Sequence, residues 1–126
     1  MILLAPIERA LAERGYTRRS GAGIVVEGWP VEFLPVASEP DEASLREAVE
    51  IELVTGFSTR VVRAEYLAAE AISVGRLKVL ARVEAFLDQN AVDLLALKWV
   101  VERFDLRDAW MSFCNRTGRA DPLGLG

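Results

Sequence analysis

The chain has 126 residues, 52% of them hydrophobic and 27% charged, a composition typical of a globular domain and unlike that of a disordered or fibrous chain. Its formal net charge of −4 excludes the overall positive field on which non-specific nucleic-acid binding relies. The chain has no histidine and a single cysteine, Cys114, expected in the core, which excludes histidine-based catalysis, an internal disulfide and a multi-cysteine metal site.

The first third of the chain predicts a helix and then a β-hairpin. Apolar residues recur at helical spacing over Pro6–Arg14, with proline at the start. Residues 16–23 are polar and rich in glycine, and we interpret them as a solvated turn, because a phosphate-binding loop would need motifs that are missing here. Two β-prone runs follow, Ile24–Glu27 and Val31–Leu34, joined through Gly28-Trp29-Pro30.

The middle of the chain predicts a helix and a third strand. Ser38 is suited to cap a helix that runs over Asp41–Leu53. Apolar residues recur along it at intervals of four, while the glutamates fall on a solvated face. Gly56 ends this unit, and the β-branched run Thr59–Arg63 indicates a short strand.

From Glu65 onward the apolar period is helical throughout. We expect helices over Glu65–Val74 and Leu77–Leu87, separated at Gly75. Asn90 and Asp93 predict the capped start of a third helix, and Asp105 with Asp108 that of a fourth. The remaining residues, 119–126, should form a flexible tail.

These elements define an α+β fold. We expect a small, mostly antiparallel sheet, made of the hairpin and one more strand, to pack against helices and to be followed by a C-terminal helical cluster. No uncharged run approaches the roughly 20 residues that span a bilayer, so we expect a cytoplasmic protein with no membrane partner.

Two stretches carry a resemblance to a known family: VEGWPVEFLP in the hairpin and AEYLAAEAISVGRLKVLARVEAFL after it. Together with the order of elements from Ile7 to Trp110, they resemble small prokaryotic nucleotidyltransferase-like proteins, the AbiEii-type toxins of toxin–antitoxin pairs and their relatives in the polymerase-β-like superfamily. In such proteins an EYL run precedes a GRxKDxxR pattern, matched here by Glu65-Tyr66-Leu67 and by Gly75-Arg76-Leu77-Lys78 with Arg82. Val79 replaces the aspartate of that pattern.

The resemblance implies a partial nucleotidyltransferase-like domain over residues 1–118. In the family, a Gly-Ser turn, a DxD pair and a third carboxylate hold two Mg²⁺ ions, because hard cations need several carboxylate oxygens. This chain has no DxD, and Glu32 alone matches the third carboxylate. We therefore expect no transferase activity from this chain alone, and Mg²⁺ binding only if an upstream DxD segment belongs to a longer, active nucleotidyltransferase.

The resemblance also implies a partner. The leading hypothesis is a catalytically incomplete domain that keeps a weak contact with a nucleotide or tRNA, since guanidinium groups favour phosphate. The candidate phosphate-binding residues are Arg18, Arg19, Arg76, Lys78 and Arg82. The simpler interpretation of each is a surface charge paired with a glutamate.

The alternative hypothesis is a protein-interaction module. It would act as an antitoxin-like or regulatory partner, or as the partner of a cognate antitoxin, through the acidic face of Asp41–Leu53 or an open sheet edge. A homodimer through that edge, or through an exposed residue such as Trp29, belongs to the same hypothesis, because unpaired edge strands favour association.

Overall fold

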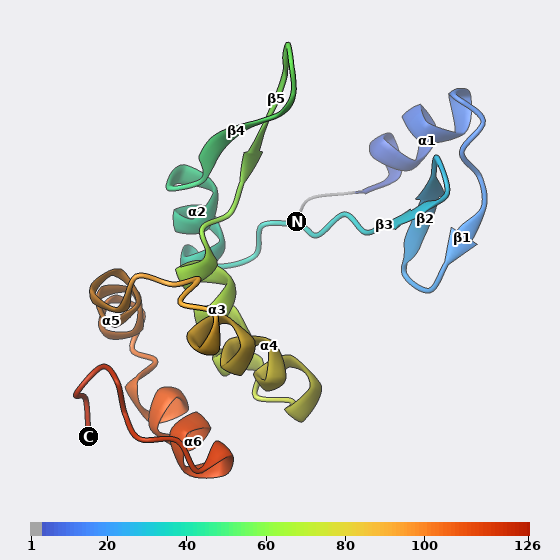
Figure 1. Cartoon of the computed structure of the whole chain (residues 1–126). Helices are drawn as coiled ribbons and strands as arrows, with labels where there is room; N and C mark the ends of the chain where they lie inside the picture. The colour runs from blue at the N-terminus through green and yellow to red at the C-terminus, as the bar shows by residue number, and fades with distance from the viewer. Residues whose placement is uncertain (1–3) are drawn as a thin grey trace. The chain divides into compact units, whose positions relative to one another are not determined.

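The computed structural model describes residues 4–126 and has an α+β fold (Figure 1). This part of the chain contains six helices and two small antiparallel sheets, of three and two strands. It divides into two compact units, Met1–Glu39 and Pro40–Gly126. The predicted fold class is confirmed, while the extent of a single domain over 1–118 stays a prediction.

The first unit contains a helix and a three-stranded sheet, ordered β1-β2-β3. Its elements are α1 (Ala5–Glu13), β1 (Arg19–Ser20), β2 (Gly23–Val26) and β3 (Trp29–Val31). The predicted hairpin exists, with Ile24 opposite Val31, but its second strand is Trp29–Val31 and not Val31–Leu34. Trp29 and Pro30, expected in the connection, pair with Val26 and Val25 instead. The glycine-rich segment, expected to be only a turn, also supplies the edge strand β1, because Gly21 turns the chain back with a φ of 58°.

The second unit holds the second sheet and the remaining helices, except for the first residue of α2. Its elements are α2 (Glu39–Arg46), β4 (Val49–Val54), β5 (Phe57–Val61), α3 (Ala64–Val74), α4 (Leu77–Asp88), α5 (Leu94–Arg103) and α6 (Arg107–Thr117). The four helices from α3 onward lie where apolar periodicity predicts them, and α3 packs against α4, α5 and α6.

The helix predicted over Asp41–Leu53 is wrong in its second half. The helix ends at Arg46, and Val49–Val54 is a strand that turns back through Gly56. The intervals of four that suggested a helix also fit the period of two of a β-strand, because four is a multiple of two. The alternation of glutamate with β-branched and aliphatic residues from Val49 onward is the strand pattern.

The third predicted strand exists, but it belongs to a different sheet. β5 pairs with β4, with Ile51 opposite Thr59, and not with the β2–β3 hairpin. The prediction of one sheet was wrong because the segment before β5 was assigned to a helix, which left the hairpin as the only available neighbour. Two strands joined by a tight turn form a sheet of their own.

The core of the second unit lies among its helices. Trp110, Phe113 and Leu97 are its largest fully buried side chains, and Cys114 packs with them as predicted. A smaller apolar cluster joins α2, α3 and α5. Leu77 at the start of α4 is exposed, and the buried stripe of this helix begins one turn later at Leu80.

Asn90 and Asp105 were predicted to begin helices, and both predictions are wrong. Both residues have a positive φ, 52° and 55°, and each follows the end of a helix. The next amides, of Ala91 and Leu106, bond back to carbonyls of the helix that has just ended, which is the Schellman arrangement. Asp93 is the residue that caps α5, accepting from the amide of Ala96 at 3.0 Å.

Residues 119–126, expected to form a flexible tail, are fixed by contacts. Leu123 and Leu125 are buried in the main core, and Asp121 accepts bonds from the amides of Leu123, Leu125 and Gly126. Arg107 donates to the carbonyl of Leu125. Composition alone suggested fraying, because this segment is rich in glycine and has no apolar period.

Candidate functional site

Glu32, the predicted remnant of a catalytic carboxylate, lies in the first unit. It follows the last residue of β3 and is exposed. Between residues 4 and 126, no group of three or more His, Cys, Asp or Glu side chains is placed to hold a metal ion. Among the described residues no such group includes Glu32, and Mg²⁺ binding, expected only if an upstream DxD segment exists, stays a prediction.

The five predicted phosphate-binding residues are divided between the two units. Arg18 and Arg19 are in the first unit, where Arg19 forms an ion pair of 3.0 Å with Glu8. The other three are exposed on the second unit, at the start and along the first turns of α4: Arg76, Lys78 and Arg82. For Arg19, the structure agrees with the simpler interpretation as a paired surface charge.

The β4–β5 hairpin has one apolar and one polar face. Residues that lie opposite each other in an antiparallel pair project from the same side of the sheet. The register therefore puts six residues on one side, here named the apolar hairpin face: Val49, Ile51, Val54, Phe57, Thr59 and Val61. The other side carries Glu50, Glu52, Ser58 and Arg60. Leu53 is the additional residue at the irregularity between Glu52 and Val54.

The apolar hairpin face is open to solvent. Val54 and Phe57 are 65% and 59% exposed, and Ile51 and Val61 are also exposed. Figure 1 shows the hairpin extending away from the helices of its own unit. With only two strands in the sheet, the outer edge of each strand is also unpaired within the sheet. Large exposed apolar patches are uncommon on proteins that stay monomeric.

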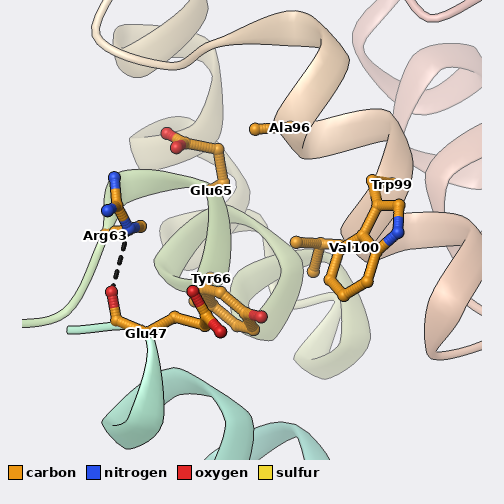
Figure 2. A pocket seen from close by; sticks show the side chains of 7 residues that line it. All are labelled: Glu47, Arg63, Glu65, Tyr66, Ala96, Trp99 and Val100. Atoms are coloured by element: carbon orange, nitrogen blue, oxygen red, sulfur yellow. Dashed lines mark hydrogen bonds between the residues drawn. The ribbon is translucent and has the colours of Figure 1, made fainter.

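A pocket of about 420 Å³ lies where the start of α3 approaches α5. Figure 2 shows the seven residues that line it: Glu47, Arg63, Glu65, Tyr66, Ala96, Trp99 and Val100. All seven belong to the second unit. The pocket thus combines three charged groups with an aromatic and aliphatic wall.

Arg63 and Glu65 are positioned by the N-terminus of α3. Arg63 is its N-cap and donates from Nε to the main-chain oxygen of Glu47 at 2.9 Å. Glu65 lies in the first turn, where a carboxylate interacts favourably with the helix dipole. Figure 2 shows its carboxylate on the same side of the pocket as Arg63 and Ala96.

Tyr66 forms the floor between α3 and α5. Its side chain is buried and its ring lies 6.3 Å from that of Phe104. Burial, and next the carboxylate of Glu47, raise the pKa of Tyr66 above its ordinary value of 10.0. The hydroxyl therefore stays neutral at physiological pH, and it adds no charge to the pocket.

Sequence reasoning missed this pocket. Glu65 and Tyr66 were noticed as part of a motif, but Arg63 was assigned to a strand and Trp99 received no role. The signal that could have marked them is a charged residue beside a helix start together with an unexplained tryptophan on a later helix. Their proximity depends on the packing of α3 against α5.

A comparison with protein families, with curated proteins and with solved structures found no match to this chain. No helix within residues 4–126 is both long and apolar enough to cross a membrane.

Proposed function

We propose that this chain is a protein-interaction module that forms a homodimer through the apolar hairpin face of β4 and β5. The observation that carries the proposal is the amphipathic two-stranded sheet whose apolar side is exposed. An isolated two-stranded hairpin is marginally stable in water and gains stability when its apolar face is covered. A partner that covers this face would supply that stabilisation.

A second copy of the chain suits this face because the face carries no charge. In a two-fold symmetric dimer the same patch meets itself, so a like charge on it would repel its own copy. The charged residues of the hairpin, Glu50, Glu52 and Arg60, all lie on the opposite side. Face-to-face packing would bury Ile51, Val54 and Phe57 of both copies and leave those charges in solvent.

Sedimentation equilibrium of the full chain tests the proposal. The wild type should form a dimer that persists in moderate salt, because an apolar contact is insensitive to ionic screening. Phe57→Lys should shift the protein toward the monomer, because it places a charge in the apolar contact. The matched control is Ser58→Lys, one residue along the same strand on the polar face, which should leave the dimer intact.

Three outcomes would overturn the homodimer. A wild-type monomer at high protein concentration would do so, as would a dimer that both lysine variants disrupt equally or that neither disrupts. A monomer that instead forms a defined complex with a different protein, lost in Phe57→Lys, would assign the same face to an antitoxin-like or regulatory partner.

A second proposal follows from Lys78 and Arg82. They lie one helical turn apart on α4, both are exposed, and neither forms an ion pair with another described residue. This arrangement leaves two cations available for the phosphates of a nucleotide or tRNA, as the family resemblance implies. A thermal titration with nucleoside triphosphates, with and without Mg²⁺, should raise Tm. If neither the wild type nor Lys78→Ala shows a rise in Tm with any nucleotide at low salt, the phosphate-binding proposal is rejected.

A further inference from the structure

Among the residues that the structure describes, Glu65 is charged and yet buried. It is 8% exposed, yet its side chain makes no hydrogen bond or ion pair with another described residue. Between residues 4 and 126, every side-chain oxygen or nitrogen atom that is fully buried has a hydrogen-bond partner. The carboxylate of Glu65 must therefore reach accessible surface, and the surface it lines is that of the pocket.

A carboxylate that has no partner within the described residues can accept hydrogen bonds from a donor that enters the pocket. The charges of the lining favour a cation as that donor. Glu47 and Glu65 each contribute −1 and Arg63 contributes +1, which leaves −1 in total. Arg63 donates its Nε–H to the carbonyl of Glu47 and forms no ion pair with Glu65, so the Glu65 carboxylate is not paired within the lining.

The rest of the lining is apolar. Trp99, 57% exposed, and Val100 come from one turn of α5 and form a wall beside Tyr66 (Figure 2). A ligand that fits both parts has a cationic head for Glu65 and an aliphatic stem for this wall. Stems of charged side chains pack on apolar surface in this way.

We propose that the pocket binds a guanidinium group carried on an aliphatic stem, with Glu65 as the anionic acceptor and Trp99 as the wall. The planar fork of a guanidinium donates two parallel hydrogen bonds to one carboxylate, which an ammonium cannot do. The arginine side chain of another protein and free arginine share this chemistry, and the pocket does not require the hairpin dimer.

Calorimetric titration of the full chain with N-acetyl-L-arginine amide tests the proposal. The matched ligand is N-acetyl-L-citrulline amide, which has nearly the same shape without the charge. The arginine compound should bind and the citrulline compound should bind at least about tenfold more weakly, the usual effect of losing one charge-assisted hydrogen bond. Equal affinities, or no heat from the arginine compound at millimolar concentration, would overturn the proposal.

Two glutamate variants locate the site. Glu65→Gln should weaken binding of the arginine compound about tenfold or more. Glu70→Gln is the control, since Glu70 is exposed on the same helix and outside the pocket, and it should bind as the wild type does. Circular dichroism confirms that each variant is folded. Wild-type affinity in Glu65→Gln would overturn the assignment, as would equal losses in both variants.

Fluorescence gives a second readout. In a Trp29→Phe background the remaining tryptophans are Trp110, which is fully buried, and Trp99. Binding should change the emission, and Trp99→Phe should abolish the change; a change that survives in Trp99→Phe would place the ligand elsewhere. If free arginine binds more tightly than N-acetyl-L-arginine amide, the ligand is a small molecule. If free arginine binds equally or more weakly, the ligand is an arginine side chain of a partner protein.

Discussion

Trp110 on α6 donates its indole N–H to the carboxylate of Asp121 in the C-terminal segment, across 2.7 Å. The indole is fully buried, and the same carboxylate accepts the amides of Leu123, Leu125 and Gly126. The carboxylate of Asp121 therefore accepts hydrogen bonds from the largest core side chain and from the backbone of the final turn. This relationship explains why residues 119–126 are held to α6.

Replacing Asp121 should destabilise the protein. Asp121→Ala leaves the buried indole N–H of Trp110 without its acceptor, and an unsatisfied buried donor costs about 1–3 kcal/mol. We expect Tm to fall by several degrees, measured by circular dichroism. Glu70→Ala, on an exposed face of α3, is the control and should leave Tm nearly unchanged. An unchanged Tm in Asp121→Ala would contradict the role of this bond.

The pKa of Asp121 predicts a dependence of stability on acid. Burial by itself raises this pKa, but the bonds from Trp110 and the three amides outweigh it and lower the pKa from 3.8 to about 2. A carboxyl whose pKa is lower in the folded state stabilises the fold above its unfolded pKa, and that stabilisation is lost as pH falls toward the folded value.

The pH test compares the wild type with Asp121→Asn. Wild-type Tm should decrease between about pH 4 and pH 2 more steeply than that of the asparagine variant, which has no proton to bind at this position. The difference between their Tm values should be largest near neutral pH. Parallel pH profiles for the two proteins would show that this carboxyl does not contribute.

Deletion of residues 119–126 should lower the free energy of unfolding. The deletion removes the buried side chains of Leu123 and Leu125, each worth roughly 1.5–3 kcal/mol when fully buried. The full-length Leu123→Ala/Leu125→Ala variant, with the backbone intact, should reproduce a large part of the loss in urea unfolding. If the segment were the flexible tail that its composition suggests, both proteins would unfold like the wild type.

Gly23 is required for the close approach of β2 to β3. A Cβ at this position would lie 2.6 Å from the carbonyl oxygen of Val31, which is backbone and cannot move aside without disturbing the pair. Gly23→Ala should therefore weaken this sheet, seen as faster hydrogen exchange at the amides of β2. Ser20→Ala, at an exposed position of β1, is the comparison and should leave that exchange unchanged.

The sequence predicted elements well where one local signal had one meaning. The apolar period from Glu65 to Thr117 corresponds to α3, α4, α5 and α6 because a helical stripe must be buried. Prediction failed where one signal fits two structures. Intervals of four fit a helix and a strand, which hid β4, and Asn90 suits both a helix start and the left-handed residue after a helix end.

The sequence by itself determined the α+β class, the absence of histidine and of a DxD pair, and the helices α3 to α6, because composition and local period carry that information. Tertiary structure alone decided the placement of the C-terminal segment and the pocket. Asp121 has no local reason to be ordered until the indole of Trp110 reaches it. Glu65 and Trp99 come from different helices, so only the packing of α3 against α5 brings the carboxylate and its apolar wall together.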